Sequence, residues 1–308
     1  MSQSISEAPP GHGGPTASHD RRQPATQQPR VPTRRGVPAL GLILAMLGSG
    51  MRVACGDEQT ASQGIESFDD RWQLALGVGA LYRPRYPGSR DYFTQVLPAP
   101  SVSYGRYFLG AAPGTGTSAA GLGAYLARAE SWSVGITVGR DMREPRRASD
   151  APVLEGWGEI PRTDHASVFG NYSYGWLVAH GDVSADIGGH HEGVLASLSL
   201  QGMFHPVPHL TLSAGPEITW ANTQYMQTFF GIDAAQSSIA GIPPYAVKGG
   251  LDSAGFAVGA DYRLTSRWSL GAHAKYGELQ GDAADSPVTA KKTQYMIAAI
   301  VAYRFGQK

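Results

Sequence analysis

The sequence predicts an all-β fold, a transmembrane antiparallel β-barrel of about twelve strands, from three observations. Apolar and polar residues alternate one by one through much of the region from residue 71 to residue 305. The alternating segments mostly run for ten to thirteen residues, and roughly nine to eleven residues of a tilted strand cross a bilayer. Their apolar faces end in aromatic residues, as expected for the two aromatic girdles of a membrane barrel.

The composition suits strands with one apolar face and one small or polar face. Charged residues make up 16% of the chain, and 40 of its 308 residues are glycine, whereas an average soluble domain has about 25% charged residues. The 25 basic and 25 acidic residues cancel, which argues against a nucleic-acid partner, because such proteins carry a basic excess. The single cysteine, Cys55, cannot form an internal disulfide or a cysteine-based zinc site.

The first 70 residues lack the alternation and divide into three segments. Residues 1–35 are rich in Pro, Gln, Ser and Arg, which predicts a disordered N-terminal extension. Residues 36–56 predict a signal peptide, because a short apolar run follows Arg34 and Arg35 and leads to small residues near Gly56. Residues 57–70 predict a polar linker, so the barrel is expected over 71–308 and export is expected to remove the signal.

The alternation also assigns each side chain to a face, because successive residues of a strand point to opposite sides. Every second residue from Trp72 to Tyr82 is apolar, and the pattern recurs from Trp268 to Tyr276. The expected strands are 71–82, 93–104, 105–111, 119–128, 131–140, 164–178, 181–190, 193–203, 209–220, 253–264, 267–277 and 293–305. The segment 105–111 is short, and losing it with a partner would leave ten strands.

The connections between these segments alternate in length. With both chain ends in the periplasm, the periplasmic turns centre on residues 105, 130, 179–181, 205–208 and 265–266, and all are short. The outer connections are mostly long and cover residues 83–92, 112–118, 141–163, 188–193, 221–252 and 278–292. Short periplasmic turns and long extracellular loops are typical of the outer-membrane barrels of Gram-negative bacteria.

Short motifs follow one another through the alternating region. A glycine-rich first strand is followed by a Y-x-G-S-x-x-Y segment, Tyr86 to Tyr92. Further motifs are Leu97-Pro98, Tyr104 to Phe108, Gly139-Arg140, Gly215-Pro216 with Trp220, Tyr225, Phe230-Gly231, Leu279 to Ala283, Ser286-Pro287 and Tyr303 to Phe305. In their order and spacing they resemble the MipA/OmpV family, the MltA-interacting protein family of outer-membrane proteins. The chain departs from barrels that end on an aromatic residue, since Gly306, Gln307 and Lys308 follow Phe305.

The resemblance implies an outer-membrane location and, for some members, a scaffold that links a lytic transglycosylase with a bifunctional penicillin-binding protein. Other members resemble adhesins or osmotically regulated surface proteins. The family has no agreed active site, so the resemblance supplies no catalytic residue and no cofactor.

Two groups of side chains suggest chemistry. His190, His191 and Glu192 suggest a metal site, but adjacent strand residues point to opposite faces, and a solvated outer turn is the alternative. His190 or His191 with Ser197 or Ser199 would make a lipid hydrolase if nucleophile and base came within hydrogen-bond reach. The alternative is a row of serines facing the lumen. We therefore predict no catalytic residue, no cofactor-binding residue and no metal ligand.

The charged residues of the barrel leave two further questions open. The arginines of one outer loop either bind lipopolysaccharide phosphates, whose geometry guanidinium groups match, or pair with acidic residues of the same loop. The arginines are Arg140, Arg143, Arg146 and Arg147, and the acidic residues are Asp141, Glu144 and Asp150. The charged residues of the lumen face either select solutes or fill a narrow lumen with ion pairs. We favour the second alternative for a barrel of about twelve strands. The residues are Arg71, Glu217, Asp261, Arg263, Lys275 and Arg304. The segment 86–92 is expected to fold onto the barrel rim.

Taken together, the sequence and the resemblance predict a non-enzymatic scaffold of the outer membrane. It would contact outer-membrane lipid and lipopolysaccharide and link murein-synthesising with murein-hydrolysing enzymes. A small-solute channel is the alternative, followed by a surface adhesin with its function in 141–163 and 221–252, and then by a barrel lipid hydrolase.

Overall fold

The structure is a computed structural model, and it describes residues 71–306 apart from 112–118, 142–144 and 191. The expected extension 1–35, signal peptide 36–56 and linker 57–70 lie outside the described residues. Within the described part of the chain, no helix has the length and apolar character needed to cross a membrane.

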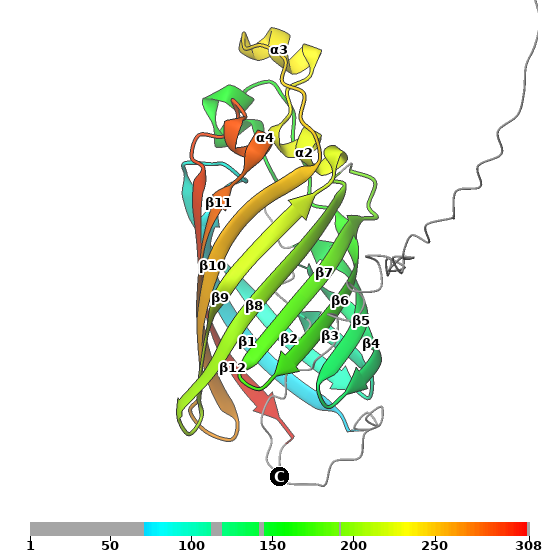
Figure 1. Ribbon diagram of the computed structural model, residues 1–308, viewed down its shortest axis with the longest axis vertical. Helices are drawn as coiled ribbons and strands as arrows, with labels where there is room; N and C mark the ends of the chain where they lie inside the picture. The colour runs from blue at the N-terminus through cyan, green and yellow to red at the C-terminus, as the bar shows by residue number, and fades with distance from the viewer. Residues whose placement is uncertain (1–70, 112–118, 142–144, 191, 307–308) are drawn as a thin grey trace, which may run out of the picture. The chain divides into compact units, whose positions relative to one another are not determined.

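Twelve strands close into one antiparallel barrel (Figure 1). Each strand pairs with its neighbours in sequence, and β1 pairs with β12 from Leu74↔Phe305 to Tyr82↔Ile297. The ten-strand alternative is wrong, because the short β3 pairs with both β2 and β4. The strands are β1 (Gln73–Pro84), β2 (Tyr92–Tyr104), β3 (Tyr107–Ala111), β4 (Ala119–Ala129), β5 (Trp132–Asp141), β6 (Asp164–Tyr174), β7 (Leu177–Asp186), β8 (Val194–Val207), β9 (Leu210–Ala221), β10 (Gly250–Arg263), β11 (Trp268–Leu279) and β12 (Thr293–Phe305).

The outer surface of the barrel is apolar, as the alternation predicts. In β1 the side chains of Leu74, Leu76 and Val78 are exposed, whereas Gly77 between them is buried. An apolar face that remains exposed around a closed barrel is a surface for lipid, because contiguous apolar patches of this size are rare on soluble monomers. The fold is therefore a transmembrane barrel.

Aromatic rings mark both ends of this apolar surface. At the end with long loops, Tyr82 stacks on Tyr92 with ring centroids 5.1 Å apart. At the end with short turns, the Trp72 and Tyr104 rings lie 4.9 Å apart, and the Trp268 and Tyr303 rings 5.0 Å apart. The two girdles predicted from the sequence are confirmed, and they place the bilayer between the short turns and the long loops.

Four of the five short turns have two residues, and two of these turns lie elsewhere than predicted. Residues 179–181 belong to β7, and the chain turns at Gly175 and Trp176 instead. Gly175 has φ of 59° and is the first central residue, where a two-residue hairpin favours glycine. The predicted strands 164–178 and 181–190 are corrected to β6 and β7 accordingly.

The second correction concerns the predicted turn 205–208. Strand β8 continues to Val207, and the chain turns at Pro208 and His209. The pairing of β8 with β9 shifts between Phe204 and Val207. A bulge at this shift accommodates Pro206, which has no N–H to donate to the ladder.

Short helices occur only in the long loops of the described chain. They gather at one end of the barrel, the end that carries the long loops (Figure 1). The helices are the 3-10 turns η1 (Ala148–Asp150) and η2 (Pro152–Leu154), and the α-helices α2 (Thr223–Phe230), α3 (Ala234–Ala240) and α4 (Gly281–Asp285).

Three aromatic side chains pack together inside the barrel. Phe108 and Phe169 are buried, with ring centroids 6.1 Å apart, and the ring of Tyr125 lies against both. Glycines in the adjacent strands make room for the rings: a Cβ on Gly123 would lie 2.1 Å from the Phe108 ring, and one on Gly135 would lie 2.4 Å from the Phe169 ring. The lumen between β3 and β6 is therefore occupied by side chains.

We expect Gly123→Ala to destabilise the barrel by roughly 1–3 kcal/mol, because an overpacked site must displace a ring that its neighbours hold in place. Gly79→Ala is the matched control, since its Cβ would meet its nearest atom at 3.4 Å, an ordinary contact. Urea unfolding in detergent micelles, followed by tryptophan fluorescence, measures both. Equal midpoints for the two variants would show that the rings can move without cost.

Candidate functional site

The long loops fold into a cap over the outer end of the barrel. We use the name cap for the residues 85–91, 145–163, 222–249 and 280–292. Helix α4 packs against β10 and β11, and α2 packs against β8. Asn222 caps α2 by accepting a hydrogen bond from the Tyr225 amide at 2.9 Å, and Asp233 caps α3 by accepting one from the Gln236 amide at 2.8 Å.

The cap has an apolar core of its own in two clusters. Helix α2 presents Tyr225, Met226, Phe229 and Phe230 to the first cluster, where all four are buried. The second cluster joins one residue from each of four separate loops, which are Tyr86, Leu154, Ile232 and Val288. Extracellular loops with buried cores are ordered structures, because burying apolar area offsets the entropy of fixing the chain.

Polar contacts tie the loops of the cap together. Buried Arg146 donates from Nη1 to the carbonyl of Phe229 at 3.0 Å. Ser286 donates from Oγ to the carbonyl of Phe230 at 2.6 Å, and Tyr245 donates from its hydroxyl to the carbonyl of Asp282 at 3.1 Å. Three of the four loops of the cap therefore share one hydrogen-bond network.

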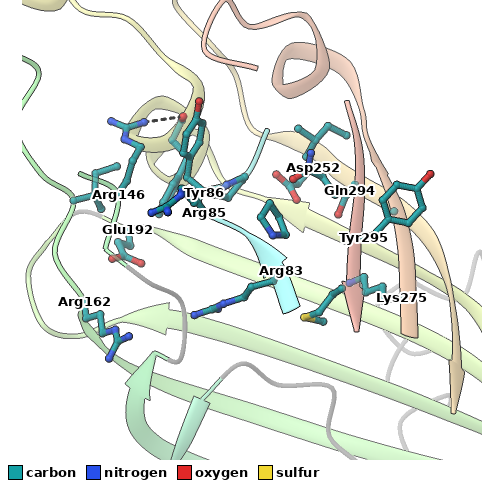
Figure 2. Close-up of a pocket in the computed structure, with 18 of the residues that line it drawn as sticks. Arg83, Arg85, Tyr86, Arg146, Arg162, Glu192, Asp252, Lys275, Gln294 and Tyr295 are labelled. Atoms are coloured by element: carbon teal, nitrogen blue, oxygen red, sulfur yellow. Dashed lines mark hydrogen bonds between the residues drawn. The ribbon is translucent and has the colours of Figure 1, made fainter. Parts of the chain in front are cut away.

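A cavity of about 230 Å³ lies between the cap and the outer ends of the strands (Figure 2). Its apolar wall includes Tyr86, Ile160, Phe229 and Leu279. Five cationic side chains and two carboxylates also line it, and these are Arg83, Arg85, Arg146, Arg162 and Lys275, with Glu192 and Asp252. The cavity thus combines apolar walls with convergent polar groups, which is the usual character of a small-molecule site.

The cations of the cavity are held by defined partners. Arg83 donates to Gln95 Oε1 at 3.1 Å, and Arg85 forms an ion pair with Asp150 at 3.4 Å. Lys275 of β11 forms an ion pair with Glu217 of β9. Burial lowers the pKa of Arg146 to about 10, although Tyr86 and Asp150 oppose this shift, so its guanidinium stays charged at neutral pH. Burial also raises the pKa of Tyr86, so its phenol is neutral there.

Below the cavity, the inner faces of β5, β6 and β7 carry a polar network. The Nδ1 of His180 lies 2.8 Å from the amide oxygen of Asn171, and the Nε2 lies 3.5 Å from Asp182. Asn171 in turn donates from Nδ2 to Ser133 Oγ at 3.2 Å. The hydrogen bonds that join His180, Asn171 and Ser133 fix these side chains, whereas His180 Nε2 is buried without a hydrogen-bond partner in the described structure.

The structure gives different positions to the members of the His190, His191 and Glu192 group. His191 lies outside the described residues, and His190 is exposed. Glu192 is buried, and its Oε2 lies 3.6 Å from His165 Nε2, so the expectation of a solvated turn is wrong for this residue. Among the described residues, no cluster of three His, Cys, Asp or Glu could hold a metal ion.

The serines considered for a hydrolase do not lie next to His190. Ser197 and Ser199 lie inside β8, opposite Asp182 and His180 of β7. Ser199 is the fifth residue after Val194, the start of β8, so a rise of about 3.3 Å per residue puts it roughly 16 Å into the strand. The described residues therefore do not assemble the pairing that the hydrolase alternative requires.

The arginines of the long outer loop pair mainly within the protein. Arg140 binds Asp164 through two contacts of 2.9 and 3.3 Å. Asp150 accepts a hydrogen bond from the backbone amide of Arg147 at 2.7 Å, while Arg146 is buried in the cap. Of the two alternatives left open, the burial of Arg146 contradicts contact with lipopolysaccharide for this residue. Arg143 lies outside the described residues.

Two further predictions concern the rim and the lumen. The segment 86–92 lies on the rim as expected: Tyr86 is buried in the cap, and the Gly88 carbonyl accepts a hydrogen bond from the Lys291 amide at 3.0 Å. In the lumen, Asp261 lies 3.4 Å from His273. This contact and the Lys275–Glu217 pair match the expectation that ion pairs fill the lumen.

The sequence did not indicate the cap core, the lumen rings or the His165–Glu192 pair. The spacing of Tyr225, Met226, Phe229 and Phe230 could have indicated the cap core, because it fits a helix and not a strand. Phe108 and Phe169 gave no signal, because an apolar residue in an alternating segment fits either face.

These features define a class: a transmembrane β-barrel of the outer membrane whose outer end carries a folded cap. The chain belongs to the MipA family, because the family described as MltA-interacting protein MipA matches residues 76–305. The resemblance inferred from the short motifs is thereby confirmed. A comparison with curated proteins gives no match.

Solved outer-membrane proteins are similar to the chain at low identity. An outer-membrane channel from Pseudomonas putida F1 is 12% identical, with a TM-score of 0.43 over 81% of this chain and 100% of that chain. The NanC porin is 10% identical, with a TM-score of 0.41 over 74% and 98% of the respective chains. OmpT, an outer-membrane protein of Vibrio cholerae, is 10% identical, with a TM-score of 0.34 over 76% and 97%.

We expect Arg146→Met to loosen the cap, because it removes the hydrogen bond from Arg146 Nη1 to the Phe229 carbonyl, and a hydrogen bond from a charged donor contributes about 1.5–3 kcal/mol. Limited trypsin digestion in micelles should then cleave faster after the exposed Lys248. Arg147→Met, which changes an exposed neighbour in the same loop, is the control. Unchanged protection in Arg146→Met would mean that the apolar clusters hold the cap without this bond.

Proposed function

We propose that the protein is a structural outer-membrane barrel that holds a murein-hydrolysing enzyme, a lytic transglycosylase of the MltA type, at its periplasmic end. The description of the family names an interaction with MltA. Through this enzyme the barrel would bring a murein-synthesising penicillin-binding protein to the same place. Export through a cleaved signal over residues 36–56 belongs to the same proposal.

The cap is the observation that carries this proposal. Its buried clusters and shared hydrogen bonds occupy the outer end of the barrel, and the aromatic rings and polar network occupy part of the lumen below. A barrel built in this way is better suited to holding partners than to free diffusion, because about eight strands leave room only for side chains and 16 or more are needed for a wide channel.

The periplasmic end offers an exposed surface for such a partner. Tyr174 precedes the β6–β7 turn and Trp176 lies in it, with 73% and 67% of their surface exposed. The Trp176 ring lies over Gly202, where an added Cβ would meet it at 2.7 Å, so it is fixed against the neighbouring strand. Trp and Tyr are enriched among the residues that dominate protein interfaces, and these two lie at the periplasmic turn where a partner could reach them.

Photocrosslinking in cells tests the proposal. A photoreactive amino acid at Glu130, Trp176 or Ser266, all in periplasmic turns, is expected to capture a lytic transglycosylase identified by mass spectrometry. The matched control places it at Ile239, which is exposed in α3 at the opposite end of the barrel. Capture of lipid and assembly factors alone from all periplasmic positions would reject the scaffold, as would equal capture from Ile239.

A small-solute channel is the second candidate, and the cation-lined cavity at the outer mouth favours it. The scaffold predicts that the wild-type barrel gives no stable conductance steps in planar bilayers. It also predicts that removing residues 223–248, the part of the cap with α2 and α3, produces such steps. Wild-type steps whose ion selectivity changes in Lys275→Gln would favour the channel, since Lys275 pairs with Glu217 in the lumen.

A further inference from the structure

A groove of about 480 Å³ lies on the lipid-facing surface of the barrel, near the end that carries the long loops. It extends over β10, β11, β12 and β1. Two rows of side chains on the outward face form most of its lining, and the residues of each row pair directly across neighbouring strands. The row nearer the loops is Phe256, Tyr276 and Tyr295, and the row below it is Val258, Ala274, Ile297 and Tyr82.

The floor of the groove is a small residue between larger ones. Ala274 pairs with Val258 on one side and with Ile297 on the other, and both larger side chains are about half exposed. A methyl group between two branched side chains leaves a depression in the wall of the barrel. No water is present in the hydrocarbon region of a bilayer, so an acyl chain is the group that fills this depression.

Two cationic side chains line the outer edge of the groove. Arg90 and Lys291 come from different loops of the cap, and the Lys291 amide joins these loops by donating to the Gly88 carbonyl at 3.0 Å. The Lys291 ammonium lies 5.6 Å from the centroid of the Tyr92 ring and 5.2 Å from that of the Tyr295 ring. Tyrosine rings of a girdle lie at the depth of the lipid headgroups, and these two rings hold the ammonium there.

The lining of the groove contains no acidic side chain among the described residues. Its third cation, Lys275, already forms an ion pair with Glu217 of the lumen. Asp285, from the adjoining loop, binds Lys292 at 2.8 Å instead of a lining residue. The acidic residues of the neighbouring segments all lie outside the lining, and they are Asp91, Glu278 and Asp285. The edge of the groove therefore presents positive charge to a ligand.

A tyrosine hydroxyl adds a neutral donor beside these cations. The Tyr92 hydroxyl accepts a hydrogen bond from the Tyr295 amide at 3.1 Å. Because a tyrosine hydroxyl also has a proton of its own, Tyr92 can donate to an oxygen of a bound headgroup. A guanidinium, an ammonium and a hydroxyl at one edge of an apolar groove match a phosphate that is attached to an acyl-bearing molecule.

We propose that this groove binds one molecule of lipopolysaccharide through lipid A, its phosphorylated and acylated sugar part. Arg90 and Lys291 would bind a phosphate, and Tyr92 would donate to a phosphate or sugar oxygen. One acyl chain would lie on Ala274. The long loops mark the outer leaflet, where this glycolipid is found, and this position favours it over a phospholipid. The inference is independent of the scaffold proposal, and it assigns one saturable site in place of general contact with lipid.

Native mass spectrometry of the folded, full-length protein in maltoside micelles tests the inference. The probes are lipid A with two phosphates, the same lipid A without phosphates, and phosphatidylglycerol. We expect one molecule of the phosphorylated lipid A to bind per barrel, about tenfold or more tightly than either of the other lipids. Losing one charge-assisted hydrogen bond accounts for roughly this factor.

Two variants separate the charge from the shape of the groove. Lys291→Met keeps the apolar length of the side chain, and it should weaken binding of phosphorylated lipid A at least about tenfold while leaving the dephosphorylated form unchanged. Ala274→Phe fills the floor, so it should weaken both forms. Lys248→Met is the matched control, because Lys248 is an exposed lysine of the cap outside this lining, and it should leave the affinity within about twofold.

The mobility of unheated samples in gels verifies that each variant is folded. If Ala274→Phe fails to fold, Arg90→Gln takes its place and should act as Lys291→Met does. The inference is overturned if phosphatidylglycerol or dephosphorylated lipid A binds as tightly as phosphorylated lipid A, or if lipid A binds in many copies of equal affinity. It is also overturned if Lys248→Met weakens binding as much as Lys291→Met.

Discussion

Inside a bilayer no water is present to satisfy a backbone N–H or C=O, so a spanning sheet must pair its first strand with its last. Here the pairing of β1 with β12, from Leu74↔Phe305 to Tyr82↔Ile297, meets this constraint. Closing the sheet also divides the side chains into two sets, because successive residues of each strand point either to lipid or to the lumen. The other features of the molecule follow from this division.

Closing the sheet creates a lumen, and large rings, ion pairs and amides occupy part of it. Phe108 and Phe169 face inward beside glycines, and the Lys275–Glu217 pair spans β9 and β11. Buried ions and amides need partners to offset the loss of water, and a closed barrel supplies these from strands far apart in sequence. The polar network around His180 follows the same logic.

The cap extends this arrangement beyond the membrane. Its two apolar clusters draw on loops that are separated by up to about two hundred residues, from Tyr86 to Val288. The barrel brings these loops to one rim, and their apolar residues then bury one another. The mouth cavity with its arginines results from this meeting of loops, strands and lumen.

Most strands and the two girdles were predictable from the sequence, because lipid imposes a period of two on each spanning strand and a length of about nine to eleven residues on most of them. The family was predictable from the resemblance of the short motifs. The positions of the turns were harder to predict. The sequence predicts a turn at 179–181, but the chain turns four residues earlier, at Gly175, which has a positive φ. The sequence could not assign Phe169 to the lumen, bury Arg146 or pair Glu192 with His165. Alternation is a local property that lipid enforces on every strand, whereas these contacts depend on which distant residues the closed barrel brings together.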